Sequence, residues 1–254
     1  MTKPQEIYDL LLDSASSAAT LQEVLIGLTW TLCQVEHQQT EALGLCMSPG
    51  IATRTLPWSG TLATHPVQQF VPWVRSWNAH EATVGLAAIN AVINLQNPLS
   101  AQAQPLSLEG SANLAVFEHF LPQIRGKRVA VIGRYPGLSR YQQAVTMTVI
   151  ERQPGEMDLP DPASEYLLPE AEWVFLTATS IANKTFPRLA ELAHQANLVL
   201  MGPTVPWLAD LAQFGVDYLA GVTVTSPDRL RQTVAEGGGV RIFETGVQYR
   251  VLKL

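Results

Sequence analysis

Small, hydroxyl-bearing and charged side chains recur where four predicted strands in the second half of the sequence end. These strand-end residues are Gly133, Arg134 and Tyr135, then Glu151 and Arg152, then Thr179 and Asn183, and finally Gly202, Pro203 and Thr204. Glycines let a backbone approach a ligand closely, and the hydroxyl, amide and guanidinium groups can hydrogen-bond it. Arg134 and Arg152 could pair with carboxylates or phosphates of a ligand, and Glu151 could act as a general acid or base. An alternative is purely local, because Gly and Pro are ordinary turn residues and Thr204 or Asn183 could cap a following helix.

A second group of candidates surrounds a helix predicted over residues 79–95. Asn78 and Glu81 have capping-box spacing, in which the Asn caps the helix and the Glu reaches back, and this role alone could explain both residues. Glu81 is otherwise the second candidate for a general acid or base. Asn90 belongs to a small, uncharged helix face, which predicts packing against another element or contact with a ligand.

Common cofactor and nucleophile motifs are weak or missing in the sequence. The turn G-R-Y-P-G that begins at Gly133 departs from the G-x-G-x-x-G fingerprint, so NAD or FAD is disfavoured, although Glu151 lies 18 residues further on, near the position of a ribose-binding acid. Cys33 and Cys46 have no C-x-x-C spacing, and the five histidines are dispersed. The spacing therefore predicts neither a zinc site nor a hydrolase triad.

Composition narrows the class of protein. The 254 residues are 47% hydrophobic and 15% charged, which indicates a folded chain with a substantial core. A net charge of −6 disfavours a dedicated nucleic-acid binder, and two cysteines cannot form a disulfide scaffold. The beginning of the chain lacks the pattern of a signal peptide, and the uncharged stretch 82–108 has too short an apolar part to span a membrane. We expect a cytoplasmic protein with reduced thiols that acts without nucleic acid or membrane.

The predicted elements divide the chain into two regions. Residues 1–95 alternate helix, strands and helices in an α+β arrangement, residues 96–110 are a predicted linker, and residues 111–254 alternate strands with helices. The expected elements are helices over 5–18, 66–76, 79–95, 185–195, 206–213 and 226–236, and strands within 24–36, 41–47, 127–133, 145–152, 171–180, 197–202, 216–224 and 241–254. The fold class is α/β, with a small α+β domain before a Rossmann-like, doubly wound and mostly parallel sheet. In such sheets ligands bind beyond the carboxyl ends of the strands, where the residues introduced above lie.

Four stretches resemble a family of bacterial and archaeal proteins associated with heavy-metal chelation, a domain of unknown function. They are SWNAHEATVGLAAINAVIN (76–94), KRVAVIGRYPGL (127–138), ERQPGEMDLPDPASEYLLPEAEWVFLTATSIANKT (151–185) and MGPTVPWLADLAQFGVDYLAGVTVTSPD (201–228). The resemblance covers nearly the whole chain. It implies an enolase-N-terminal-like domain, a Rossmann-like domain, a site in the cleft between them, and a divalent or heavy-metal ion whose identity and ligands stay open.

Two functions are consistent with these observations. In the first, the interdomain cleft binds a small molecule or a metal chelate. In the second, an enzyme acts on a small organic anion in the same cleft, with Glu81 or Glu151 as the acid or base. A cleft could also assemble metal-ligating acids from Glu81, Glu151, Asp158 and Glu165. An adaptor that acts by protein contact, and assembly into a homo-oligomer, are left open.

Overall fold

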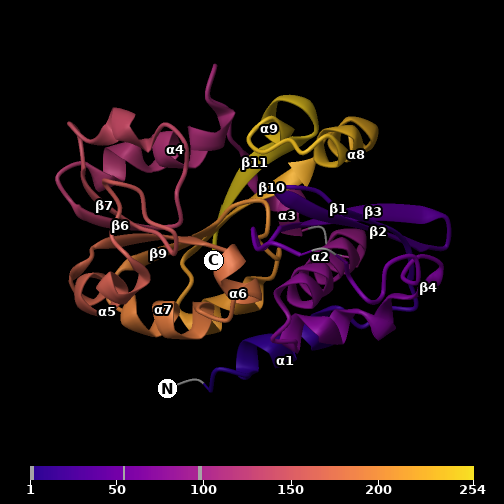
Figure 1. Ribbon diagram of the computed structural model, residues 1–254. Helices are drawn as coiled ribbons and strands as arrows, with labels where there is room; N and C mark the ends of the chain where they lie inside the picture. Colours follow the sequence, from indigo (N-terminus) through magenta and orange to yellow (C-terminus); the bar gives the residue numbers. More distant parts are fainter. Residues whose placement is uncertain (1–2, 54, 97–98) are drawn as a thin grey trace.

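Two β-sheets organise the protein, for which a computed structural model describes residues 3–53, 55–96 and 99–254 (Figure 1). The first sheet is antiparallel, with the strand order β3-β2-β1-β4. Its elements, with the helices and 3₁₀ turns of this region, are α1 (Glu6–Ser14), β1 (Thr20–Ile26), β2 (Trp30–His37), β3 (Thr40–Met47), β4 (His65–Pro66), η1 (Val67–Gln69), η2 (Val71–Arg75) and α2 (Ala79–Gln96).

Two expectations for this region were wrong in detail. The stretch 24–36 is not one strand, because the chain reverses after Ile26 and pairs β1 with β2, with Ile26 opposite Thr31. The expected helix over 66–76 is two 3₁₀ turns, since Pro72 inside this stretch supplies no backbone N–H for a helical hydrogen bond.

Helix α2 is buried continuously from Ala82 to Ile93. It packs closely on the sheet because Gly44 of β3 has no side chain, and a Cβ atom there would stand 2.2 Å from Ala87 O. Gly85 plays the same role on another side, where a Cβ would stand 2.3 Å from the nitrogen of Val74. The absence of charged residues after Glu81 in this helix follows from its burial against protein on several sides.

The second sheet has the strand order β5-β11-β10-β9-β8-β6-β7, in which β7 to β10 run parallel to β6, and β11 and β5 are antiparallel to their neighbours. Its strands are β5 (Gln104–Pro105), β6 (Arg128–Ile132), β7 (Thr146–Ile150), β8 (Trp173–Thr177), β9 (Asn197–Met201), β10 (Tyr218–Val224) and β11 (Val247–Lys253). The α-helices of this region are α3 (Leu99–Gln102), α4 (Ala115–Ile124), α5 (Ser164–Leu167), α6 (Thr179–Ala182), α7 (Phe186–Leu192), α8 (Pro227–Ala235) and α9 (Ile242–Thr245). The order of the five parallel strands is that of a doubly wound sheet, and its topological switch point lies between β6 and β8. The α/β fold class is therefore confirmed.

Three further segments differ from the expected elements. The stretch 206–213 forms the 3₁₀ turns η7 (Ala209–Phe214) instead of an α-helix. The stretch 241–254 contributes one strand and a short helix, and β11 lies inside the sheet because β5 pairs on its outer side. The segment predicted as a linker thus contributes α3 and β5, while its residues 97–98 lie outside the described part.

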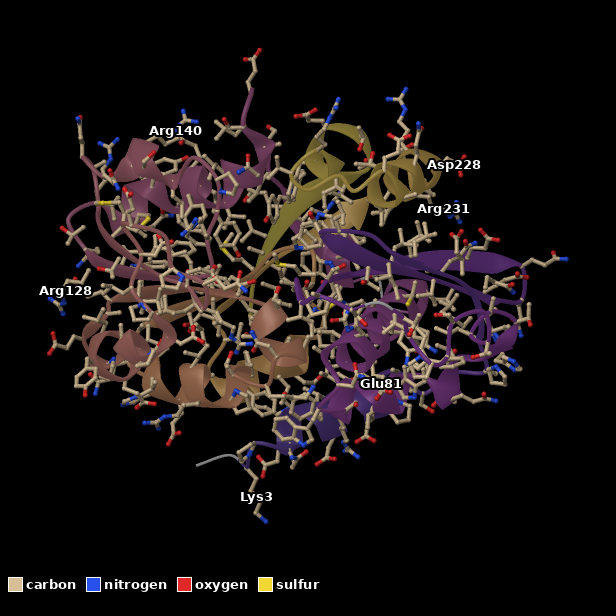
Figure 2. The ribbon with its side chains drawn as sticks, viewed as in Figure 1. Lys3, Glu81, Arg128, Arg140, Asp228 and Arg231 are labelled. Carbon is tan, nitrogen blue, oxygen red and sulfur yellow. The ribbon has the colours of Figure 1, made fainter. Side chains whose placement is uncertain are left out.

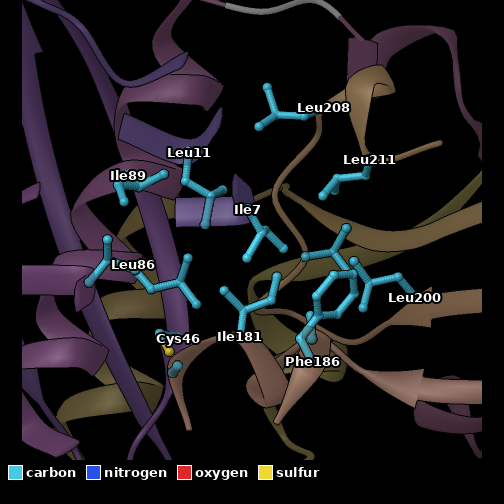
Figure 3. Packing of buried hydrophobic residues seen from close by; sticks show 14 of the residues in the cluster. Ile7, Leu11, Cys46, Leu86, Ile89, Ile181, Phe186, Leu200, Leu208 and Leu211 are labelled. Carbon is cyan, nitrogen blue, oxygen red and sulfur yellow. The ribbon is translucent and has the colours of Figure 1, made fainter. Parts of the chain in front are cut away.

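One hydrophobic cluster joins the two sheets. Ile7, Leu11, Leu86 and Ile89 of the first region lie in the same cluster as Ile181, and Figure 3 shows this packing. Polar contacts reinforce the junction. The hydroxyl of Tyr8 donates to Ile181 O at 3.0 Å. The two regions therefore share a core.

Helix α8 adds an electrostatic contact at the same junction. Arg231 is mostly buried and lies where α8 meets the first sheet (Figure 2). Its Nε atom is 3.1 Å from Glu23 of β1, and it also donates to Gln34 of β2. Charge-assisted contacts of this kind fix the orientation of the two partners as well as their separation.

In the described part of the chain, no helix is both long enough and apolar enough to cross a membrane.

Candidate functional site

A cavity of about 1140 Å³ lies where the carboxyl ends of β6, β7, β8 and β9 face residues 29–30 and 47–51 of the first region. The strands bring all ten predicted strand-end residues to its lining, because neighbouring parallel strands end at one edge of a sheet. These residues are Gly133, Arg134, Tyr135, Glu151, Arg152, Thr179, Asn183, Gly202, Pro203 and Thr204.

At this edge two glycines leave the main chain uncovered by side chains. Gly133 follows β6 with a φ of +99°, and Gly202 follows β9 with a φ of +106°, a region that side-chain-bearing residues rarely adopt. A Cβ atom on Gly133 would stand 3.2 Å from Thr177, which ends β8. Gly133 therefore lies at the switch point between β6 and β8, where ligands of doubly wound folds bind.

Tyr135 lies beside these glycines and contributes a phenol to the cavity. Its ring meets Phe117 edge to face at 5.4 Å. Burial raises the pKa of Tyr135, so it stays protonated and is able to donate a hydrogen bond.

The Glu151 carboxylate is bound by the surrounding backbone. One oxygen accepts from Arg134 N at 2.9 Å, and the other accepts from Arg152 N at 2.7 Å and Gln153 N at 3.3 Å. These three donors tie the turn after β6 to the turn after β7. Because both oxygens are engaged, the geometry favours a role in fixing the loops over proton transfer to a ligand.

Arg134 is held at both its backbone and its side chain. Its guanidinium pairs with Asp158, and a Cβ on Gly155 would collide with that guanidinium at 2.4 Å. A hydrogen bond from Gly155 N and the Arg134 guanidinium lower the pKa of Asp158. The side chain of Arg134 is still half exposed, so it can bind a ligand anion.

Other cationic side chains at the cavity are likewise positioned by carboxylates. Arg152 Nε lies 3.3 Å from Asp161, and Arg188 binds both carboxylate oxygens of Glu165 and also pairs with Glu191 at 2.9 Å. Among the described residues, five cationic side chains and three carboxylates line the cavity. The cations are Arg134, Arg152, Lys184, Arg188 and Arg241, and the carboxylates are Glu151, Asp161 and Glu165.

The polar residues among the remaining strand-end positions make hydrogen bonds within the protein as well as lining the cavity. Asn183 accepts from the backbone N–H and the hydroxyl of Thr185 at 3.1 and 2.7 Å, so it stabilises the turn that leads into α7. Thr179 interacts with Thr177 Oγ1 through both its nitrogen and its hydroxyl. Thr204 Oγ1 accepts from Met47 N at 3.0 Å, which links the loop after β9 to β3.

The three candidates from the first region do not line this cavity. Asn78 caps α2, since its Oδ1 accepts from His80 N at 3.0 Å and Glu81 N at 3.3 Å. Glu81 accepts from Ser76 Oγ at 2.5 Å, and Figure 2 shows it at the beginning of α2. Asn90 donates to Leu45 O and to Thr204 O, both at 2.9 Å, so it joins the two regions. Local and packing roles account for all three.

The described residues do not fit a directly bound metal ion. No group of three or more His, Cys, Asp or Glu side chains that could hold one occurs in residues 3–53, 55–96 and 99–254. Each of the four acids that could have formed such a site has another partner: Glu81 has Ser76, Glu151 has backbone N–H groups, Asp158 has Arg134, and Glu165 has Arg188. Cys33 and Cys46 are fully buried in the core, and burial raises the pKa of both thiols, that of Cys46 to about 12.

Sequence reasoning missed the cationic residue Lys184. It directly follows Asn183, has a left-handed backbone (φ +71°), and donates from Nζ to Val74 O at 2.5 Å and Ala182 O at 3.0 Å. Burial lowers the pKa of Lys184 to about 8. Lys184 could have been predicted from its position just beyond the end of β8, where ligand-site residues are expected.

The cavity wall from the first region was also missed. Trp30 and Met47 lie at the end of an antiparallel hairpin, and they reach the cavity because the two regions pack together. No local sequence pattern predicts that these residues line a cavity with the second region.

Known proteins share this architecture. The crystal structure of a protein of unknown function from Desulfitobacterium hafniense DCB-2 superposes with a TM-score of 0.83 and 30% identity, over 99% of this chain and 98% of that one. A protein of unknown function from Pyrococcus horikoshii gives a TM-score of 0.78 at 24% identity, over 99% of both chains, which supports the fold alone. An uncharacterized protein of Methanocaldococcus jannaschii is 28% identical over 171 residues, so the match spans 64% of this chain and 62% of that relative.

Family models cover both regions. A model described as "Putative heavy-metal chelation", DUF364, matches residues 115–253, and a second with the same description, DUF4213, matches residues 8–93. Both solved structures are also described as members of DUF364. The chain therefore belongs to the DUF364 family, whose description names heavy-metal chelation.

Proposed function

We propose that the protein binds an anionic small molecule, such as a metal chelate, in the cavity between its two sheets. The observation that carries this proposal is the cavity of about 1140 Å³ at the switch point of the parallel sheet, with five cationic side chains in its lining. A net charge of −6 makes this accumulation of cations unlike the rest of the chain. Arginines held by carboxylates keep their remaining N–H groups directed for carboxylate or phosphate oxygens.

The family description names heavy-metal chelation, but the described residues form no metal-ligand cluster. Both observations agree if the protein binds a metal chelate as an anion. A chelated metal already has its ligands, so the protein needs hydrogen-bond donors for the chelator's oxygens and needs no metal ligands of its own. Arg134, Arg152 and Arg188 supply such donors at the ends of β6 and β7 and on α7. In this proposal the chelator coordinates the metal, and the protein binds the chelator.

The enzymatic alternative has less support. Glu151 has its carboxylate oxygens bound to backbone N–H groups, and Glu81 lies outside the cavity lining. Neither residue stands free beside the space in which a substrate would bind.

Substitution-inert cobalt complexes test the proposal directly. Cobalt(III)–EDTA is a singly charged anion whose metal cannot exchange ligands on the time scale of a titration, whereas hexaamminecobalt(III) is a cation of similar inertness. We expect saturable calorimetric binding of the EDTA complex, and no binding of the hexaammine complex or of free Ni²⁺. Arg134→Met should weaken binding of the EDTA complex by about tenfold or more, the loss expected for one charge-assisted hydrogen bond.

Arg128→Met is the matched control, because Arg128 begins β6 while Arg134 follows its end, and Arg128 lies outside the cavity lining. This variant should bind the EDTA complex like the wild type. Tight binding of free Ni²⁺ without binding of the anionic complex would show that the protein coordinates metal itself, and would overturn the proposal.

A further inference from the structure

Exposed apolar side chains line part of the same cavity. Met47, Ile51 and Val240 are 40%, 55% and 43% exposed, and all three line the cavity. Large hydrophobic side chains left in contact with water mark binding surfaces when they are grouped in a concave site.

Hydrogen bonds join the segments that carry these side chains into one surface. Trp30 Nε1 donates to Gly239 O at 3.0 Å, and Ser48 N donates to Thr29 O at 2.8 Å. The segments 29–30, 47–51 and 239–243 are therefore neighbours, and we call their lining residues the apolar wall. Phe243 extends it, stacked on Tyr249 with ring centroids 4.6 Å apart.

The apolar wall differs in charge from the segments that carry the other cavity-lining arginines. Among its described residues Arg241 alone is charged, and that side chain lies 3.7 Å from Glu244. Arg134, Arg152 and Arg188 come from other segments of the chain, beyond the ends of β6 and β7 or on α7. One cavity thus offers both anion-binding groups and an aromatic and aliphatic surface, on different segments.

We infer that the ligand is amphipathic: an anion with two or more acidic oxygens at the arginines and an aromatic or similarly flat apolar body on the apolar wall. This inference rests on the proposed function and adds the class of ligand. The cavity volume is consistent with it, since pockets for ligands of drug size are about 300–1,000 Å³, and a small dicarboxylate alone would leave most of about 1140 Å³ empty.

Two dicarboxylates of equal charge test the inference. Succinate carries the two carboxylates alone, and phenylsuccinate adds one phenyl ring to the same skeleton. We expect phenylsuccinate to bind at least about tenfold more tightly in calorimetric titrations, because full burial of a Phe-sized side chain favours the bound state by that factor or more.

Substitutions in the apolar wall test whether it causes the higher affinity for phenylsuccinate. The double variant Ile51→Ser/Val240→Ser should lose most of the preference for phenylsuccinate while its affinity for succinate is unchanged. Leu28→Ser is the matched control, since Leu28 is 83% exposed but lies outside the cavity lining, and it should keep the full preference. Arg134→Met should weaken both acids by the same factor.

The failures of the two proposals are distinguishable. Equal affinities for the two acids, or the same loss of preference in Leu28→Ser, would overturn the amphipathic ligand and leave anion binding in place. No saturable binding of either acid, together with no binding of cobalt(III)–EDTA, would overturn both.

Discussion

Replacing Asn90 with alanine tests how firmly the two regions are joined. The Asn90 side chain is 3% exposed, and its Nδ2 atom donates to Leu45 O and Thr204 O. Asn90→Ala leaves both carbonyls without this donor, and each unsatisfied buried group costs about 1–3 kcal/mol. The variant also removes Oδ1, which is buried without a partner, so part of the loss is offset. We expect a net loss of about 3 kcal/mol, measured by urea unfolding, and a fall in Tm of about 6–12 °C for a chain of this size.

Asn94→Ala is the matched control one helical turn further along α2. Asn94 donates from Nδ2 to Leu43 O at 2.8 Å, but that acceptor belongs to the first region and the Asn94 side chain is exposed. Its loss should cost about 0.5–1.5 kcal/mol. Equal effects of the two substitutions would refute the reasoning, because they would show that the bond to Thr204 contributes nothing to the junction.

Four further results are expected. Gly44→Ala should destabilise the protein by more than the usual overpacking range of about 1–3 kcal/mol, because the new Cβ meets the backbone of α2; urea unfolding measures this, and a smaller loss would show that α2 shifts easily. Arg134→Met should lower Tm by only a few degrees, because Arg134 is half exposed and Asp158, although only 10% exposed, keeps the hydrogen bond from Gly155 N. Glu81→Gln should leave the affinity for cobalt(III)–EDTA unchanged in calorimetry. Lys184 has a pKa lowered from 10.5 to about 8, so between these values the native chain binds fewer protons than the unfolded chain. Wild-type stability should therefore rise relative to Lys184→Met as the pH increases from 8 to 10.5, which thermal unfolding of both proteins across that range would check.

The parallel sheet could be predicted from the sequence because its signals are local. The buried strands are short apolar runs, and two of them end directly before a glycine, as Ile132 precedes Gly133 and Met201 precedes Gly202. Ligands of such sheets bind at the carboxyl ends of the strands, and this rule predicted that the strand-end residues lie at one site. In the structure they line one cavity. The turn between β1 and β2 was harder to predict, because Gly27 stands within an otherwise continuous apolar stretch.

The roles of individual site residues could not be predicted so well. The partners of Glu151 and Arg134 depend on how the loops after β6 and β7 fold against each other, which no spacing encodes. For Asn90, the uncharged helix face predicted packing or ligand contact, and the structure shows a hydrogen bond to the other region. The apolar wall arises only when residues near Trp30 meet residues near Val240, far away in the chain.

Because the chain is synthesised from its N-terminus, the shared core can form only after the second region has been made. Asn90 and its partner Thr204 are 114 residues apart, so a ribosome that adds about 5–20 residues per second completes the second partner about 6–23 s after the first. During that interval α2, which carries no charged residue after Glu81, has its first sheet but lacks the covering from α6 and the loop after β9. The nascent chain therefore presents an apolar helix to the surrounding solvent for many seconds. We expect this segment to be the main contact of chaperones that bind the unfinished protein.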